Sequence, residues 1–207
     1  FPSMIALVNY GLGNIRAFEN IYKRLNVPVL VASSANELMS AEKIILPGVG
    51  AFDGAMCRLQ ASGMRECLDD LVLNKMRPVL GICVGMQIMA RRSDEGAIPG
   101  LGWIKADVRK LNNRSSSNKE ILLPHMGWND VYPVNKTTLF RRLDAPCFYF
   151  LHSYYFAPDD DGCMLAKTDY NGYFASAVQS GNIFGVQFHP EKSHMCGMQL
   201  LKNFSEL

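Results

Sequence analysis

The first half of the chain alternates between short apolar runs and amphipathic stretches. Strands are predicted at the apolar runs, residues 4–9, 29–32, 43–46 and 79–82, whose length and continuity are typical of strands buried on both faces. Helices are predicted at residues 14–25, 51–74 (with a break near Gly63) and 84–92, and Asn14 is a suitable N-cap for the first of them. This alternation favours an α/β fold with a mostly parallel central sheet flanked by helices.

The second half of the chain has a different pattern. Strand-like runs occur at residues 103–111, 121–123, 130–132, 148–151, 163–167, 174–179 and 183–188. Turn signals separate them, including "DDDG" at 159–162 and "NG" at 171–172, and the polar stretch 112–119 predicts a mobile loop. Residues 193–204 predict a closing helix with Ser193 as its N-cap. We therefore expect an antiparallel sheet to be joined to the parallel one.

Length and composition limit the classes of protein to consider. The chain has 207 residues, 48% of them hydrophobic, and a formal net charge of +2. We interpret residues 1–3, which precede Met4, as the remnant of an expression tag and expect one domain over residues 4–207. The weak net charge argues against a nucleic-acid partner. No apolar run is long enough for a membrane span, and no basic segment typical of a signal peptide precedes the first one.

The cysteines favour a cytoplasmic location. Six occur, none of them in a C-x-x-C pair, and scattered cysteines without an export signal are typical of a reduced compartment. Five of them are expected to be small buried or partly buried side chains: Cys57, Cys67, Cys147, Cys163 and Cys196.

Cys83 has neighbours that suggest another role. It stands between Gly81 and Gly85 in "GICVG", at the point where a predicted strand meets a predicted helix. This is the form of a nucleophile elbow, in which a sharp turn lifts a reactive side chain above the sheet and the helix start favours the thiolate. A buried structural cysteine at a glycine-flanked strand end is the alternative that this pattern alone leaves open.

A thiol nucleophile needs a base, and His189 is the best candidate. Pro190 favours extended geometry at His189, so Glu191, two residues on, can approach the imidazole and orient it. A structural histidine is the alternative. A zinc site at His189, His194 and Cys196 is not expected, because their spacing fits no common zinc pattern.

Backbone amides are the candidate donors to an oxyanion. One is the amide of Val84, which follows the nucleophile. The loop Gly48-Val49-Gly50 follows a predicted strand and can supply another, although an ordinary strand-to-helix turn has the same composition. The glycines of "GLGN" at 11–14 lack the third glycine of a dinucleotide-binding motif, which excludes that function.

Together these motifs resemble the class I (triad) glutamine amidotransferases. The shared marks are "PGVG" at 47–50, "GICVGMQ" at 81–87 and the late "HPE" at 189–191. Four further stretches resemble the glutaminase subunits of imidazole glycerol phosphate synthase: "NYGLGN" at 9–14, "LPHMGWND" at 123–130, "FYFLHSYYF" at 148–156 and "GVQFHPEKS" at 185–193. The resemblance covers residues 4–207 and implies a single domain with a flavodoxin-like amidotransferase fold.

The resemblance implies L-glutamine as the substrate and no cofactor. Cys83 would form a glutamyl thioester, His189 would act as base and then acid, and Glu191 would orient it. Gln87 and Glu95 match positions at which the family holds glutamine. The backbone of His152, Ser153 and Tyr154 would lie near the glutamine carboxylate.

The resemblance also implies a partner. In these glutaminases, ammonia passes to a (β/α)8-barrel synthase subunit in a heterodimer. The expected docking residues are Gly11, Asn14, Pro124, His125, Met126, Trp128 and Lys192. A core tryptophan and a solvated surface lysine are the alternatives for Trp128 and Lys192.

The product pathway is left open between alternatives. The ammonia would serve imidazole glycerol phosphate and AICAR formation in histidine biosynthesis, or, in a paralogous branch, a sugar amidotransferase of surface-polysaccharide biosynthesis. A cysteine-elbow protein of another class, such as a chaperone-like protein or a peptidase, is disfavoured by the His-Pro-Glu sequence.

Overall fold

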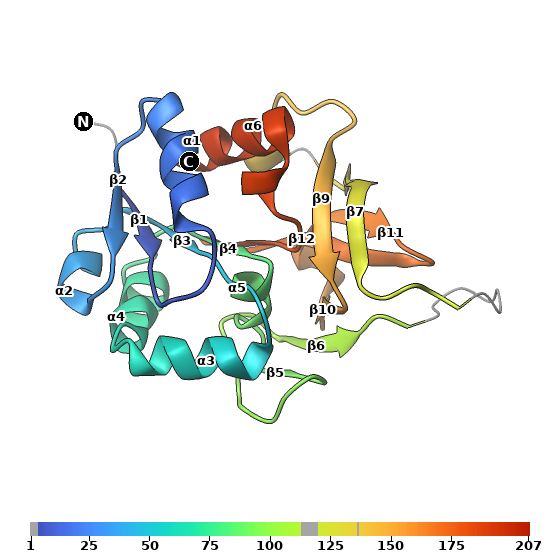
Figure 1. Ribbon diagram of the computed structural model, residues 1–207, viewed down its shortest axis with the longest axis horizontal. Coiled ribbons are helices and arrows are strands. Elements are labelled where there is room, and N and C mark those ends of the chain that lie inside the picture. The colour runs from blue at the N-terminus through green and yellow to red at the C-terminus, as the bar shows by residue number, and fades with distance from the viewer. Residues whose placement is uncertain (1–3, 113–119, 136) are drawn as a thin grey trace.

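The computed structural model describes residues 4–112, 120–135 and 137–207, and its centre is an eight-stranded mixed sheet (Figure 1). The strand order is β2-β1-β3-β4-β13-β12-β11-β8. Five neighbouring strands are parallel, namely β2 (Val29–Ala32), β1 (Ile5–Val8), β3 (Lys43–Leu46), β4 (Val79–Ile82) and β13 (Ile183–Val186). The other three continue the sheet in antiparallel fashion: β12 (Tyr173–Ser180), β11 (Met164–Asp169) and β8 (Tyr132–Pro133).

Helices cover both faces of the parallel part of the sheet (Figure 1). One face carries α1 (Ile15–Arg24) and α6 (His194–Ser205). The other carries α3 (Phe52–Ala61), α4 (Arg65–Asp69) with the π-helical turn η1 (Asp70–Asn74), and α5 (Val84–Gln87). The short helix α2 (Ala35–Leu38) follows β2. Four of the five parallel strands are buried at every residue, as expected for a sheet covered on both faces.

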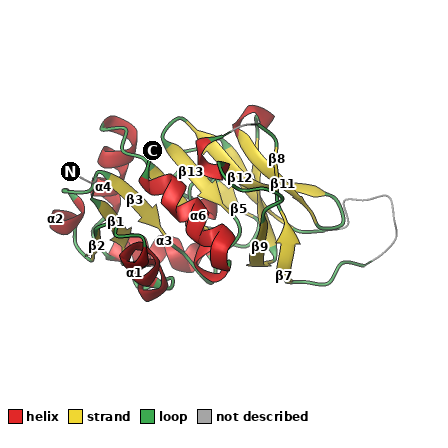
Figure 2. Ribbon diagram, turned by 90° about the horizontal axis from the view of Figure 1, so that it is seen from above, coloured by secondary structure: helices red, strands yellow, loops and turns green. Residues whose placement is uncertain are grey.

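Two small sheets complete the second half (Figure 2). One contains β10 (Tyr154–Pro158), β6 (Ala106–Lys110) and β5 (Arg92–Ser93), and the other contains β7 (His125–Asp130) and β9 (Cys147–His152). Three 3-10 turns connect these parts: η2 (Thr138–Phe140), η3 (Asp161–Cys163) and η4 (Pro190–Lys192).

The predicted fold class is confirmed: a parallel core flanked by helices is extended by antiparallel strands. The predicted strands 29–32, 43–46 and 79–82 agree with β2, β3 and β4 at both ends. Asn14 caps α1 as expected, because its Oδ1 accepts a hydrogen bond from the amide of Ala17. The helix predicted over 51–74 is interrupted after Ala61, next to Gly63.

Other predicted elements were wrong. The helix over 84–92 ends at Gln87, because the carbonyls of Ile88–Arg91 accept hydrogen bonds from the segment 100–104 instead of continuing the helix. No strand forms at 121–123, and the next strand, β7, begins at His125. The sequence reading missed α2 and β10. Ser193 precedes α6, but its hydroxyl does not cap the helix.

Three further expectations can be compared with the structure. Four of the five cysteines expected to be buried or partly buried are so, whereas Cys57 is exposed on α3. The tag assignment for residues 1–3 and almost all of the polar loop 112–119 lie outside the described residues. Within the described ranges, no helix is both long and apolar enough to cross a bilayer.

The close packing between α5 and β3 yields a test of stability. A Cβ atom on Gly85 would lie 2.0 Å from the carbonyl oxygen of Leu46, so the backbone of one element would have to move. We expect Gly85→Ala to lower the free energy of unfolding by about 3 kcal/mol, as severe overpacking does. Urea unfolding measures it.

Gly54→Ala is the matched control, because Gly54 lies within α3 and a Cβ there meets no atom within 4 Å. Alanine is the better helix former, so this variant should gain about 0.5–1 kcal/mol. A Gly85→Ala protein as stable as the wild type would show that the elbow does not need the close approach.

Candidate active site

Cys83 lies in a strained turn between β4 and α5. Its backbone has φ 54° and ψ −113°, values that a residue with a side chain rarely adopts. The amide of Cys83 donates to the carbonyl oxygen of Val186 at 2.8 Å, which ties the turn to β13. The strained turn is the geometry of a nucleophile elbow, so the site expected from "GICVG" has the expected local structure.

The two flanking glycines are required by packing. A Cβ on Gly81 would lie 2.6 Å from Cε of Met89 and 2.8 Å from the carbonyl oxygen of Gly85. A Cβ on Gly85 would meet the backbone of Leu46 and Pro47. No larger residue fits either position without moving the main chain, which explains the spacing of the motif.

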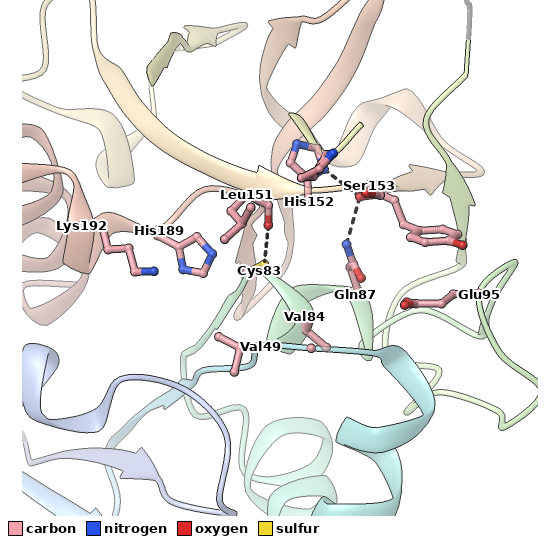
Figure 3. A pocket seen from close by; sticks show the side chains of 13 residues that line it. Val49, Cys83, Val84, Gln87, Glu95, Leu151, His152, Ser153, His189 and Lys192 are labelled. Atoms are coloured by element: carbon pink, nitrogen blue, oxygen red, sulfur yellow. Dashed lines mark hydrogen bonds between the residues drawn. The ribbon is translucent and has the colours of Figure 1, made fainter. Parts of the chain in front are cut away.

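His189 and Glu191 form a buried pair beside Cys83. The Nδ1 of His189 lies 2.6 Å from Oε1 of Glu191, and both side chains are only 3% exposed. A carboxylate accepts hydrogen bonds, so Nδ1 carries the proton and Nε2 is the nitrogen available to the thiol. Figure 3 shows the imidazole ring next to Cys83.

The contact between His189 and Glu191 forms differently from the prediction. His189 is extended, with φ −102° and ψ 94°, but Pro190 and Glu191 belong to the 3-10 turn η4. The turn places the carboxylate of Glu191 next to Nδ1 of the imidazole ring. The hydroxyl of Ser193 holds this turn, since it donates to the carbonyl oxygen of His189 at 2.6 Å and accepts from the amide of Tyr149 at 3.0 Å.

The surroundings of His189 favour the imidazolium form. Burial by itself would lower its pKa, but hydrogen bonds and charge interactions with Cys83 and Glu191 outweigh burial and raise the pKa to about 10. At neutral pH the ring therefore holds protons on both nitrogens, one on Nδ1 towards Glu191 and one on Nε2 towards the sulfur. This arrangement suits a site in which Nε2 keeps the proton given up by the thiol and later delivers it to a leaving group.

The loop 47–50 approaches the elbow closely. A Cβ on Gly48 would lie 2.5 Å from the amide nitrogen of Gly85, and the hydroxyl of Tyr10 donates to the carbonyl oxygen of Pro47 at 2.6 Å. Burial, with a smaller contribution from Cys83, raises the pKa of Tyr10 far above its usual value, so this hydroxyl stays a donor. A Cβ on Gly50, whose φ is 84°, would meet no atom within 4 Å, so the close packing against the elbow is at the Gly48 end of the loop.

A cavity of about 310 Å³ opens above the sulfur, at the small end of the range for ligand sites (Figure 3). Ten of the residues predicted to be catalytic, to stabilise an oxyanion or to bind substrate line it: Val49, Gly50, Cys83, Val84, Gln87, Glu95, His152, Ser153, Tyr154 and His189. Two predicted docking residues, Pro124 and Lys192, line its rim, and so does Leu151. Gly48 and Glu191 lie behind this wall.

Gln87 and Glu95 lie on the same side of the sulfur (Figure 3). The Nε2 of Gln87 donates to the carbonyl oxygen of Tyr154 at 3.0 Å and to Oε1 of Gln187 at 3.1 Å. The carboxylate of Glu95 accepts from the amide of Phe52, the first residue of α3, at 3.3 Å. The cavity thus has an amide and a carboxylate on one side of the thiol and the imidazole of His189 on the other.

The prediction that His125 lies at the docking surface was wrong. This side chain is 3% exposed and stacks between Phe150 and Tyr170. Its Nδ1 lies 2.8 Å from Nε2 of His152, whose Nδ1 lies 2.8 Å from the carbonyl oxygen of Tyr154. Burial lowers the pKa of His125 to about 4, so the ring is neutral and supports the cavity wall from behind.

The other predicted docking residues are exposed: Gly11, Asn14, Pro124, Met126, Trp128 and Lys192. Trp128 is 50% exposed and stacks on His194, with ring centroids 5.3 Å apart, so it is not a core residue. His194 therefore has an aromatic partner. No group of three potential metal ligands occurs among the described residues.

The sequence reading missed Gln187, which the structure places against Cys83. Its Nε2 lies 3.6 Å from the sulfur, and the side chain has no exposed surface. The available signal was a polar residue inside an otherwise apolar strand, two positions before His189.

Comparison with known proteins identifies the family of the chain. The family model described as glutamine amidotransferase class-I matches residues 6–206. The chain is 57% identical over 205 residues to the imidazole glycerol phosphate synthase subunit HisH of Bdellovibrio bacteriovorus, covering 99% of this chain and 100% of that protein. The HisH subunit of Leptospira interrogans is 49% identical over the same shares of both chains.

Solved structures support the fold. The crystal structure of a glutamine amidotransferase superposes with a TM-score of 0.71 at 17% identity, covering 98% of this chain and 99% of that one. PurLQS from Thermotoga maritima gives a TM-score of 0.71 at 18% identity, covering 99% and 98%. At these identities the likeness concerns the fold alone.

The raised pKa of His189 gives a test of the buried pair. Removing the carboxylate charge in Glu191→Gln should lower the pKa of His189 by at least about one pH unit. NMR titration of the imidazole measures it, with Glu66→Gln on the exposed face of α4 as the control. An unchanged pKa of His189 in Glu191→Gln would show that the carboxylate charge does not stabilise the imidazolium.

The same interaction predicts how stability depends on pH. Because the pKa of His189 is raised in the folded state, its stabilisation is complete below the ordinary pKa of 6.5 and is lost as the pH rises towards about 10. Glu191→Gln should therefore flatten the fall in the free energy of unfolding over this range.

Proposed function

Since the chain belongs to the class I glutamine amidotransferase family, we propose that it is the glutaminase subunit of an imidazole glycerol phosphate synthase and hydrolyses L-glutamine through Cys83, His189 and Glu191. The buried pair of His189 and Glu191 beside a strained cysteine elbow is the observation that supports this most strongly. The names of three similar relatives support the choice of synthase.

The reaction begins from the form in which Nε2 of His189 holds the proton that the Cys83 thiol has given up. The thiolate attacks the carboxamide carbon of glutamine, and the charge moves to the carboxamide oxygen, towards the amides of Val84 and Val49. His189 then protonates the departing nitrogen, which leaves as ammonia and gives a glutamyl thioester. Water, activated by the neutral ring, attacks the thioester and releases glutamate and the thiol.

The cavity supplies groups that suit glutamine. The carboxylate of Glu95 is at hand for the α-ammonium group, and the backbone at His152–Tyr154 is at hand for the α-carboxylate. Gln87 already uses its Nε2 towards Tyr154 and Gln187, so its carbonyl oxygen is the atom available to accept a hydrogen bond from substrate.

The proposed partner is a (β/α)8-barrel synthase subunit that receives the ammonia. Exposed apolar side chains occur on segments that also supply cavity-lining residues: Leu122 and Met126 stand on either side of Pro124 in the sequence, and Met126 pairs with Leu151 across β7 and β9. Both are more than half exposed. Apolar residues gathered at the mouth of a catalytic cavity are typical of a protein interface. Docking there would place the partner over the point where ammonia forms.

Other functions have less support. The sugar amidotransferase has less support, because the similar relatives carry the synthase name. A non-enzymatic cysteine-elbow protein has no need of the buried carboxylate behind His189. A peptidase is disfavoured because the glutamine amidotransferase class-I model matches residues 6–206. We therefore place the product ammonia in imidazole glycerol phosphate and AICAR formation, within histidine biosynthesis.

Cys83→Ala tests the proposed chemistry in the complex with the partner. Removing the nucleophile should reduce glutamine-dependent synthesis by at least about 10⁴-fold, while synthesis from added ammonia is retained. Cys57→Ala, an exposed cysteine on α3, is the control. Loss of both activities, with the complex intact, would contradict the assignment.

The roles of His189 and Glu191 can be separated in the same assay. His189→Asn removes the proton carrier, whereas Glu191→Gln removes only its orienting charge. We expect the loss in Glu191→Gln to be roughly 100-fold smaller. Equal losses in two folded variants would contradict these roles.

Met126→Ala tests the docking surface. It should weaken the complex about tenfold or more if it lies in the interface core, as measured by titration calorimetry. Met39→Ala, at the C-cap of α2, is the matched control, since the side chains of Met126 and Met39 are 65% and 61% exposed. Equal affinities for the two variants would exclude this surface.

A further inference from the structure

Gln187 is a fully buried amide in contact with the reacting sulfur. It follows β13, and its backbone amide donates to the carbonyl oxygen of Ser176 at 2.9 Å. Its side chain has 0% exposure. Burying an amide without partners is costly, so both ends of this side chain need hydrogen bonds.

The neighbours determine which end of the amide faces the sulfur. The Nε2 of Gln87 points at Oε1 of Gln187 at 3.1 Å, and its other acceptor is the carbonyl oxygen of Tyr154 at 3.0 Å. Two nitrogens cannot pair here, so the oxygen of Gln187 must face Gln87. Its Nε2 is then directed to Sγ of Cys83, 3.6 Å away.

We propose that Gln187 is a catalytic residue of the glutaminase reaction, which donates a hydrogen bond to the Cys83 sulfur and stabilises the thiolate. A hydrogen bond to a charged acceptor in a buried site is stronger than one to a neutral acceptor. The inference rests on the proposed function for its substrate, but the contact between the amide and the sulfur does not.

The donor does not itself transfer a proton. The thiol proton passes to Nε2 of His189, and the N–H of Gln187 stays on Gln187 throughout. The sulfur loses charge when it attacks the carboxamide and regains it when water has added to the thioester and the C–S bond breaks. The contribution of Gln187 therefore grows as the thiolate leaves, so we expect thioester hydrolysis to be slowed most in its variants.

Gln187 also connects the nucleophile to the substrate cavity. The chain of hydrogen bonds runs from Tyr154 through Gln87 and Gln187 to Cys83. The hydrogen bonds that direct the oxygen of Gln87 towards the cavity therefore also direct the N–H of Gln187 towards the sulfur. A change at Gln187 should affect glutamine binding as well as the thiol.

The experiment measures the ionisation of Cys83 without using glutamine. Iodoacetamide alkylation of the Cys83 peptide is followed by mass spectrometry against pH in the full chain. Gln187→Met removes the donor at similar volume, and Gln187→Glu replaces it with an acceptor. We expect alkylation at about pH 6 to be at least about tenfold slower in both variants and to approach the wild-type rate at high pH, where every thiol is ionised.

Gln179→Glu is the matched control, because Gln179 lies on β12 and its Nε2 donates to the carbonyl oxygen of Gly181. Alkylation profiles of folded Gln187 variants that coincide with the wild type would overturn the proposal. Reactive Cys83 in the wild type without glutamine hydrolysis in any complex would instead overturn the proposed function and leave the role of Gln187 standing.

A measurement on the wild type tests the proposal even where the Gln187 variants do not fold. The side-chain amide protons of Gln187, observed by ¹⁵N NMR, should titrate with the midpoint of the Cys83 thiolate absorbance, and this transition should vanish in Cys83→Ala. An amide signal that does not follow thiolate formation would overturn the proposal.

Discussion

The close approach of the Cys83 elbow to the end of β3 is the constraint on which the site depends. Gly85 lies against the carbonyl of Leu46, and Gly48 lies against the amide of Gly85, so neither position has room for a side chain. This contact places the nucleophile next to the loop 47–50. The strain at Cys83 persists because β4, β13 and the start of α5 hold the turn from three sides.

Burial strengthens the hydrogen bonds and charge interactions between the polar groups of the site. Glu191 and His189 on one side of the sulfur, and Gln187 and Gln87 on the other, exchange hydrogen bonds where water is excluded. Electrostatic interactions are stronger in such surroundings, which is why the pKa of His189 rises despite its burial. The cavity is thus built from hydrogen-bonded groups held in place by the sheet behind them.

Local pattern predicted the elements wherever local forces decide them. Continuous apolar runs became β2, β3 and β4, since a strand buried on both faces needs no other signal. The pattern failed where distant segments compete for the backbone. The helix after Cys83 stops at Gln87 because the segment 100–104 takes its carbonyls, and β10 exists because β6 pairs with it. Neither partner can be recognised from the helix or strand alone.

The sequence by itself determined the chemistry: the spacing of glycines around Cys83, the His-Pro-Glu sequence and the loop 47–50 are readable because strand ends and turns demand particular residues. Their convergence depends on strand order, since β3, β4 and β13 are neighbours whose carboxyl ends share one edge. Only the tertiary structure decided that His125 is buried and that Gln187 reaches the sulfur. Both depend on which side chains share a desolvated interior, and residues far apart in the sequence make up that interior.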